Sequence, residues 1–194
     1  MEMHAFEKRV VNALSRYYLR WYLLPRFLRL LDAPLRGHGL ALGPGVGWEA
    51  FALAERFPEA TLAGVDYDPD QVARARRNLA AHPALAGRIV FEQGDAAALA
   101  FPKETFDFAY ELNVLHHIAD YRRALREVHR ILRPGAPFVL QDLSRAFFPP
   151  GFRRLFPPES LFTRDELARE LEAAGFGVEA AAGRAVIFLR ARRR

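Results

Sequence analysis

The stretch ALGPGVGWEA, residues 41–50, places glycine at 43, 45 and 47 between an apolar run and a segment with helical spacing. This pattern predicts a strand that enters a glycine turn and continues into a helix. Glycines in such a turn let a ligand approach the backbone closely. No Gly-Lys-Ser/Thr follows, which argues against a P-loop for triphosphates. This stretch alone leaves two alternatives: a dinucleotide-binding fingerprint on Gly45, Gly47 and Ala50, or a plain tight turn.

On both sides of the turn, segments typical of strands alternate with segments typical of helices. The expected strands cover residues 37–43, 60–68, 88–95, 105–112 and 136–143, followed by a pair at 177–182 and 184–192. The expected helices cover residues 48–57, 69–82, 121–132 and 162–176. This alternation predicts right-handed βαβ units and a mostly parallel sheet with helices on both faces. Sheets of this kind bind ligands at the carboxyl ends of their strands.

Two segments lie outside this alternation. Residues 4–31 have helical spacing with a basic and aromatic character, and Pro25 is expected to kink or split that helix. Residues 144–160 form one long irregular segment, a kind of loop that is often functional. The expected organisation is one domain over 1–194, made of a helical N-terminal extension (1–35) and an α/β core (36–194).

The composition limits the function classes. Of the 194 residues, 51% are hydrophobic and 26% charged, as in a globular chain. Cysteine is absent, which excludes disulfides, thiolate metal sites and a cysteine nucleophile, and fits a reducing compartment such as the cytoplasm. No signal peptide, bilayer-spanning segment or bound metal is expected. The net charge of +5 is almost entirely arginine. Two alternatives explain this positive charge: a bias in composition, or a basic surface that binds an anionic partner.

Acidic residues end two further strands. Asp66 ends the expected second strand, where a carboxylate can accept hydrogen bonds from both hydroxyls of a ribose. Asp68 is better explained as the N-cap of the next helix. Asp95 ends the third strand, where its carboxylate and the N–H of Ala96 can read an adenine edge. Taken singly, each of these features is common in turns.

Taken together, the motifs resemble class I S-adenosylmethionine-dependent methyltransferases of the type that acts on small molecules. The resemblance rests on ALGPGVG, GVDYDPDQVARAR, FDFAYELNVLHHI, LREVHRILRPG and FTRDELARELEAAGF, and spans roughly residues 36–194. It implies a Rossmann-like three-layer α/β/α sandwich with a seven-stranded, mostly parallel sheet and an antiparallel last strand. Dinucleotide dehydrogenases do not combine these motifs.

The resemblance also implies a cofactor site for S-adenosylmethionine and its product S-adenosylhomocysteine. Gly43, Gly45 and Gly47 would admit the methionine part. Asp66, with Tyr67 beside it, would hold the ribose. Asp95 and Ala96 would hold the adenine, and Glu111 and Leu112 would lie beside the methionine or the sulfonium.

One position departs from the family pattern. The family usually carries Asp or Glu where this chain has Ala41, and that acid helps to hold the cofactor's amino group. One hypothesis is that Glu111 supplies the missing negative charge. The alternative is that the family tolerates Ala41 and water fills the space.

The catalytic group is less defined than the cofactor site. The candidates for a general base near the predicted strand ends are His116, His117, Glu111 and Asp142, and the histidines are favoured because of their pKa. Both histidines can equally be packing residues, because LHH recurs in this family whatever the substrate.

The expected acceptor is a small, apolar or aromatic molecule. ELNV stands where methyltransferases of planar amino groups carry Asn/Asp-Pro-Pro-Tyr/Phe, which argues against that class. The basic aromatic segment at 4–31 and the 144–160 loop are expected to select the acceptor. They could do so as an apolar lid, as a peripheral membrane contact or as an RNA-binding surface. An RNA or protein methyltransferase and an inactive cofactor-binding partner subunit remain alternatives.

Overall fold

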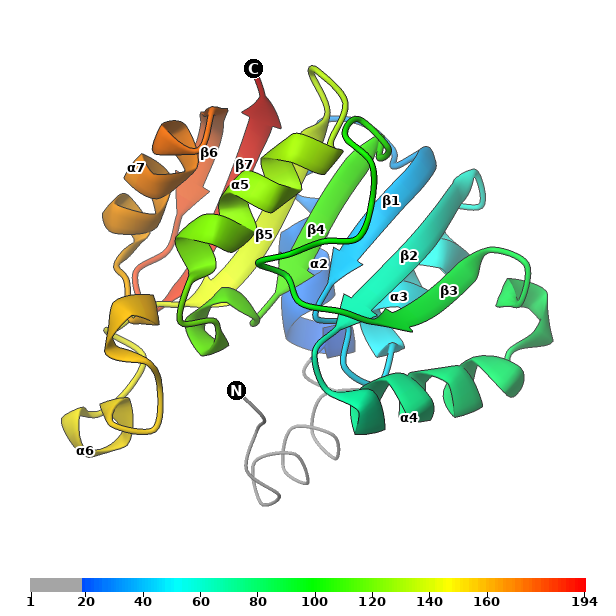
Figure 1. Cartoon of the computed structure of the whole chain (residues 1–194), viewed down its shortest axis with the longest axis horizontal. Coiled ribbons are helices and arrows are strands. Elements are labelled where there is room, and N and C mark those ends of the chain that lie inside the picture. Colours follow the sequence, from blue (N-terminus) through cyan, green and yellow to red (C-terminus); the bar gives the residue numbers. More distant parts are fainter. Residues whose placement is uncertain (1–18) are drawn as a thin grey trace.

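The computed structural model describes residues 19–194, which form a seven-stranded sheet between two layers of helices (Figure 1). The strand order is β3-β2-β1-β4-β5-β7-β6. The strands are β1 (Gly37–Leu42), β2 (Ala60–Asp66), β3 (Ile89–Gln93), β4 (Phe108–Leu112), β5 (Pro137–Leu143), β6 (Phe176–Ala182) and β7 (Val186–Arg193). Only β7 runs antiparallel to its neighbours, so the expected sheet is confirmed.

The helices cover the two faces of the sheet. The longer ones are α3 (Trp48–Arg56), α4 (Pro69–Ala80), α5 (Tyr121–Ile131) and α7 (Arg164–Ala173). Shorter ones are η1 (Leu19–Leu23), α2 (Leu24–Leu28), η2 (Pro83–Leu85), η3 (Leu115–His117), α6 (Pro150–Arg153) and η4 (Pro158–Ser160). Among residues 19–194, no helix is both long and apolar enough to cross a membrane.

The core is divided by the sheet into two apolar clusters. One lies under α5 and α7 and includes Leu40, Leu42 and Phe138. The other lies under α2, α3 and α4 and includes Ala41 and Tyr110. Neighbours along a strand therefore face opposite helical layers, as the period of two requires. This alternation decides which side of the sheet each functional side chain can reach.

The helix boundaries follow from local chemistry. Asp68 accepts from the N–H of Asp70 and caps α4, and Pro69 occupies the first turn. Thr163 and Glu166 form a reciprocal capping box at the start of α7. The predicted caps of these two helices are confirmed.

The two segments that lie outside the alternation of strands and helices differ from what the sequence predicted. Residues 144–160 are not wholly irregular, because they contain α6 and η4. Pro25 lies in the first turn of α2, where the π-helical turn η1 ends, so the helix is divided there. The expected helix over residues 4–18 lies outside the described residues.

The last strand is fastened to the segment that follows α2. Arg190 donates to the carbonyl oxygen of Leu30 at 2.8 Å, and Arg192 pairs with Asp32 at 2.5 Å. Both arginines also pair with Glu179 on β6. Chain segments separated by 160 residues thus meet at one side of the sheet.

Candidate active site

The glycine turn is held by the end of the neighbouring strand. The N–H of Gly45 donates to Asp66 Oδ2 at 2.8 Å, and the N–H of Asp68 donates to Asp66 Oδ1 at 3.0 Å. The N–H of Gly43 donates to the carbonyl of Val65 at 2.8 Å. Asp66 therefore ties the β1 turn to the start of α4.

The three glycines of the turn have left-handed backbone but different surroundings. A Cβ at Gly43 would lie 2.5 Å from a methyl carbon of Val114, and one at Gly47 would lie 2.8 Å from the ring of Phe91. A Cβ at Gly45 would meet no atom within 4 Å. Gly43 and Gly47 thus serve the packing of the turn, whereas Gly45 faces open space.

The residues predicted for the ribose and the adenine lie together beside this turn. The N–H of Gly94 donates to the backbone carbonyl of Asp66 at 3.0 Å, which brings the exit of β3 to the exit of β2. Asp95 is exposed, and its Oδ1 accepts from the N–H of Ala97 at 2.8 Å. Ala96 is half-buried, and Tyr67 is 56% exposed. The structure thus brings the predicted residues of β1, β2 and β3 to one edge.

The end of β4 joins the same edge. Glu111 is fully buried, and its Oε2 accepts from the N–H of Val114 at 3.0 Å, while Oε1 has no hydrogen-bond partner. Leu112 is half-buried. Asn113 follows with φ of +63°, an uncommon conformation for a residue with a side chain, and its Oδ1 accepts from Gln141. Neither Asn113 nor Gln141 was singled out from the sequence.

Glu111 and Ala41 face opposite layers of the sheet. In the parallel register, Ala41 pairs with Tyr110 and lies in the cluster under α2 and α3. Glu111 pairs with Leu42 and therefore faces the opposite layer. Burial raises the pKa of Glu111 well above its usual value, and the nearby charge of Asp142 raises it further. Glu111 therefore keeps its proton to a higher pH than an exposed glutamate does, and its role in place of the acid missing at Ala41 stays a prediction.

We expect Glu111→Gln to remove a pH-dependent loss of stability. Burial raises the pKa of Glu111 in the folded parent, so its carboxyl ionises at a higher pH there than in the unfolded chain, where it ionises above pH ~4.3. Parent stability therefore falls with rising pH by up to about 1.4 kcal/mol per pH unit in this range, and glutamine abolishes that contribution. Urea unfolding should show a larger advantage of the variant at pH 7 than at pH 5. An equal difference at both pH values, or the same change in exposed Glu92→Gln, would contradict this account.

A histidine–aspartate pair lies next to Glu111. His116 Nδ1 forms a short hydrogen bond with Asp142 Oδ1, and the backbone N–H of His116 donates to Asp142 Oδ2 at 3.3 Å. His116 is 3% exposed and Asp142 is fully buried. Ser160 Oγ donates to the carbonyl of His116 at 2.7 Å, which ties the pair to η4. A carboxylate on Nδ1 leaves Nε2 as the acceptor nitrogen of the imidazole.

An aromatic group surrounds this pair. The rings of His116 and His117 are 4.1 Å apart, and those of Phe148 and Phe156 are 4.3 Å apart. Phe156 also lies 5.4 Å from His116 and 5.3 Å from His117. Burial and the adjacent His116 lower the pKa of His117 to about 3, so that ring is neutral at pH 7. We call these four side chains the aromatic cluster.

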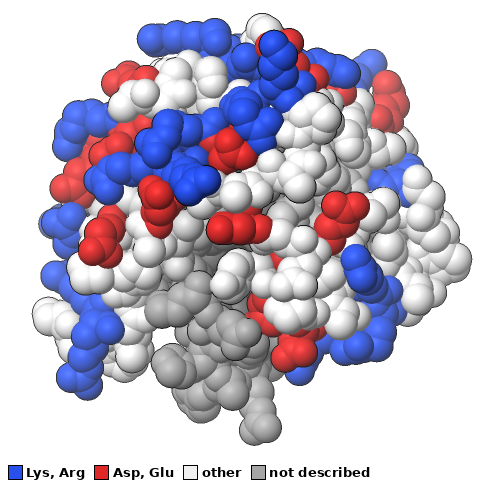
Figure 2. All heavy atoms as spheres, viewed as in Figure 1, with Lys and Arg blue, Asp and Glu red and all other residues white. Residues whose placement is uncertain are grey.

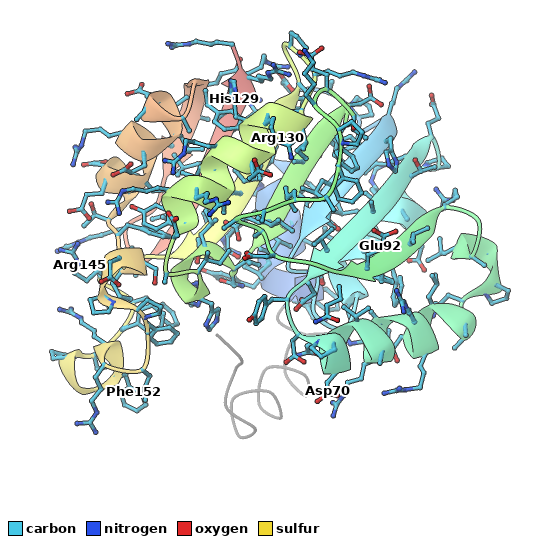
Figure 3. All side chains as sticks on the ribbon, viewed as in Figure 1. Asp70, Glu92, His129, Arg130, Arg145 and Phe152 are labelled. Carbon is cyan, nitrogen blue, oxygen red and sulfur yellow. The ribbon has the colours of Figure 1, made fainter. Side chains whose placement is uncertain are left out.

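The loop that supplies the two phenylalanines projects beyond the strand ends. Figure 3 shows Phe152 on α6 at its outer end and Arg145 closer to the sheet. Phe152 is 60% exposed, whereas Phe148 is buried. The sequence indicated that this loop is functional, but it did not indicate which of its aromatic residues turn inward.

The sequence matches a family model described as a methyltransferase domain over residues 40–140, slightly more than half of the chain. The chain belongs to the class I S-adenosylmethionine-dependent methyltransferases. Its fold agrees with the S-adenosylmethionine-dependent methyltransferase from Aquifex aeolicus, with a TM-score of 0.77 at 18% identity and 100% coverage of both chains. The residues matched by the family model include the glycine turn, the ends of β2, β3 and β4, and both His116 and His117.

Two curated relatives are similar in sequence to this methyltransferase, and the name of only one of them specifies an acceptor molecule. A demethylmenaquinone methyltransferase of Thermus thermophilus is 36% identical over 144 residues, covering 74% of this chain and 58% of the relative. The O-methyltransferase cnsE of Penicillium expansum is 33% identical over 153 residues, covering 75% and 54%. The methyltransferase therefore spans little more than half the length of these relatives.

The donor set of this methyltransferase fits S-adenosylmethionine. The cofactor offers ribose hydroxyls, an adenine amine and an ammonium, which are hydrogen-bond donors. The site offers the acceptor oxygens of Asp66 and Asp95 at one edge, beside the open face of Gly45. The residues present therefore match the polarity of the cofactor.

Proposed function

We propose that this chain transfers a methyl group from S-adenosylmethionine to a hydroxyl group of a small aromatic molecule. The observation that carries the proposal is the buried His116–Asp142 pair inside the aromatic cluster, at the strand edge that holds the glycine turn. In this reading Gly43, Gly45, Gly47, Asp66, Tyr67, Asp95, Ala96 and Leu112 form the cofactor site.

The cofactor supplies an electrophilic methyl group on a sulfonium. The chain's own task is to orient the acceptor oxygen and to remove its proton. His116 Nε2 takes the proton while Asp142 holds Nδ1 and stabilises the imidazolium that forms. His117 is a poor base because of its lowered pKa, and we assign it to the wall of the acceptor site.

The acceptor class rests on the rings and on the relatives. The faces of Phe148 and Phe156 suit an apolar, planar molecule, which can stack on them. The name of one relative specifies oxygen methylation, which agrees with a hydroxyl acceptor. The name of the other specifies demethylmenaquinone, which agrees with a planar ring as acceptor but whose methyl group goes to a ring carbon. Phe156 contacts both imidazoles, so an acceptor must displace it to reach His116.

The surface charge gives less support to an RNA acceptor. Blue and red side chains are interleaved over much of the face shown in Figure 2. Many of the described arginines are engaged by acids, as in Arg122–Glu170, Arg130–Glu127, Arg133–Asp107, Arg145–Glu166 and Arg192–Glu179. A surface that contacts phosphates needs arginines that are not already paired.

Two measurements test the proposal. We expect S-adenosylmethionine and S-adenosylhomocysteine to raise the melting temperature, and NADH to leave it unchanged. We then expect radiolabelled methyl transfer to naphthols and hydroquinones, and none to the same rings with every oxygen already methylated. Failure of both sulfur cofactors to bind would refute the cofactor assignment. Binding without transfer to any hydroxylated ring would favour the inactive partner subunit.

A further inference from the structure

The loop after β5 carries a tip, residues 147–155, that projects beyond the strand ends and exposes large apolar side chains. Phe152 is 60% exposed, Leu155 is 48% exposed and Phe147 is 47% exposed. Figure 1 shows α6, the helical part of this tip, set apart from the sheet and from the helices that cover it. Three of the six large apolar side chains that are exposed among residues 19–194 thus lie within nine residues of the chain. A cluster of this kind marks a surface that meets a partner or a membrane.

The tip is basic and contains no acid. Residues 147–158 include Arg153 and Arg154 and neither aspartate nor glutamate. Neither arginine forms an ion pair with residues 19–194; Arg154 is exposed, and Arg153 donates through Nε to the carbonyl of Phe148 at 3.0 Å. Figure 2 shows blue side chains among white ones over this projection, at the lower left of the molecule. The tip thus presents two arginines that are not already paired, beside three exposed apolar side chains.

The base of the tip is held against the aromatic cluster. Phe148 is buried there, and its ring lies 5.3 Å from that of exposed Phe147 and 4.3 Å from that of Phe156. Arg145 donates through Nε to the carbonyl of Leu161 at 2.8 Å, which fixes the start of the loop to the segment before α7. Ring contacts therefore lead from the exposed surface of the tip into the aromatic cluster.

We propose that the tip binds the surface of a lipid bilayer that contains anionic headgroups. Phenylalanine and leucine side chains at the end of a projection can enter the boundary between headgroups and acyl chains. Arginine guanidinium groups donate paired hydrogen bonds to lipid phosphates, and each basic residue near an anionic surface adds to the attraction. A specific protein partner needs about 800 Å² of matching surface on this side, which a tip of nine residues with charge of one sign does not offer.

Docking in this way places the acceptor side of the site against the bilayer. The tip and two rings of the aromatic cluster come from the same loop, which leaves the sheet at the carboxyl end of β5. An apolar acceptor is concentrated in the bilayer, and from there it reaches the aromatic cluster past Phe156. This consequence rests on the proposed function, whereas the contact with lipid does not, so separate measurements test the two.

Sedimentation with vesicles tests the lipid contact on the full chain. We expect the parent to bind vesicles of phosphatidylcholine with about 25% phosphatidylglycerol at least tenfold more tightly than vesicles of phosphatidylcholine alone. The affinity for the anionic vesicles should fall several-fold when the salt concentration rises from about 50 mM to about 300 mM, because salt screens the attraction of the arginines. Equal binding to both kinds of vesicle, or binding to neither, would contradict the proposal.

Variants of exposed residues assign the contact to the tip. The double change Phe152→Ser and Leu155→Ser should weaken binding to the anionic vesicles by at least fivefold, and Arg154→Glu should weaken it by a similar factor. The matched controls are Val90→Ser, at an exposed apolar residue of β3, and Arg74→Glu, at an exposed arginine of α4. Each control should weaken binding less than twofold. If Arg154→Glu and Arg74→Glu weaken binding equally, net charge and not the tip attracts the protein, and the assignment is wrong.

A fluorescent label reports whether the tip enters the bilayer, because the sequence contains no cysteine that would compete for the label. A Cβ at Gly151 meets no atom within 4 Å, so Gly151→Cys accepts the label without a clash. We expect the emission of a nitrobenzoxadiazole group there to shift to the blue on anionic vesicles. The same group on Glu55→Cys, at an exposed position of α3, should keep its emission. No shift on Gly151→Cys would place the tip outside the bilayer and overturn the proposal.

Turnover separates the docking from the proposed function. With a long-chain naphthol carried in anionic vesicles, the Phe152→Ser and Leu155→Ser double variant should transfer methyl groups at least fivefold more slowly than the parent. With a water-soluble naphthol the two rates should agree within twofold. If the parent methylates no naphthol but binds vesicles through the tip, the lipid contact is supported and the proposed function fails. If the parent binds no vesicle and instead forms a dimer that the double variant dissociates, the tip pairs two copies of the chain and the lipid contact is refuted.

Discussion

Asp142→Asn is expected to lower the rate of methyl transfer by about 10²- to 10⁴-fold, the usual contribution of a general base. An asparagine amide can donate to His116 Nδ1, which would hold the proton on Nε2 and remove the nitrogen that accepts the acceptor's proton. Binding of S-adenosylhomocysteine should change less than twofold, because Asp142 lies on the acceptor side of the site. Single-turnover transfer to a naphthol, with calorimetry of the cofactor, measures both quantities.

The acidity of the acceptor provides the decisive control for this prediction. A phenol that is already ionised at the assay pH does not need a base, so nitrophenols should regain most of the lost rate in Asp142→Asn. His116→Ala should lose a similar factor, and the double variant should lose little more, since the two groups act as a unit. His117→Ala should lose less than tenfold. A parent-like rate for Asp142→Asn with a weakly acidic phenol would rule out the base assignment.

Gly43→Ala and Gly45→Ala should have opposite consequences, although both glycines have positive φ, at +61° and +53°. At Gly43 the new methyl would meet Val114, so strain and overpacking together should cost about 2–4 kcal/mol of stability. At Gly45 the methyl enters open space, and we expect a cost of about 1 kcal/mol. The same methyl occupies the space proposed for the cofactor, so the Kd for S-adenosylhomocysteine should rise more than tenfold.

A double variant checks the reason given for Gly43. Adding Val114→Ala should recover at least 1 kcal/mol of the loss in Gly43→Ala, measured as a coupling energy in urea unfolding. Gly135→Ala is the matched glycine control, because Gly135 also has a positive φ, at +78°, and lies in open space. If Gly43→Ala and Gly45→Ala lose equal stability and equal affinity, the assignment of packing to Gly43 and of ligand approach to Gly45 is wrong.

The sequence predicted the sheet, its helices and the edge where the site lies. It succeeded because strand periodicity, caps and glycine turns are local signals. The hypothesis that Glu111 supplies the charge missing at Ala41 stays a prediction, because adjacency at one sheet edge does not specify a face. Only the register of β1 and β4 shows that the two positions face opposite layers.

The residues that the sequence missed share one physical cause. Asn113 follows β4 and Gln141 stands in β5, so neither is distinctive until the two strands are paired. Phe148 and Phe156 lie in a loop with several other aromatic residues, and tertiary contacts alone select them. The partnership of His116 with Asp142 joins residues 26 apart in the chain. Long-range pairing of this kind leaves no local pattern.

The tie between β7 and the segment after α2 also sets an order of folding. Arg190 and Arg192 can engage Leu30 and Asp32 only after the final strand has entered the sheet between β5 and β6. Contacts across 160 residues close a long loop, and the entropy of that closure delays them. During synthesis on the ribosome, Leu30 and Asp32 therefore emerge well before β7, and they find these partners only after β7 has been made.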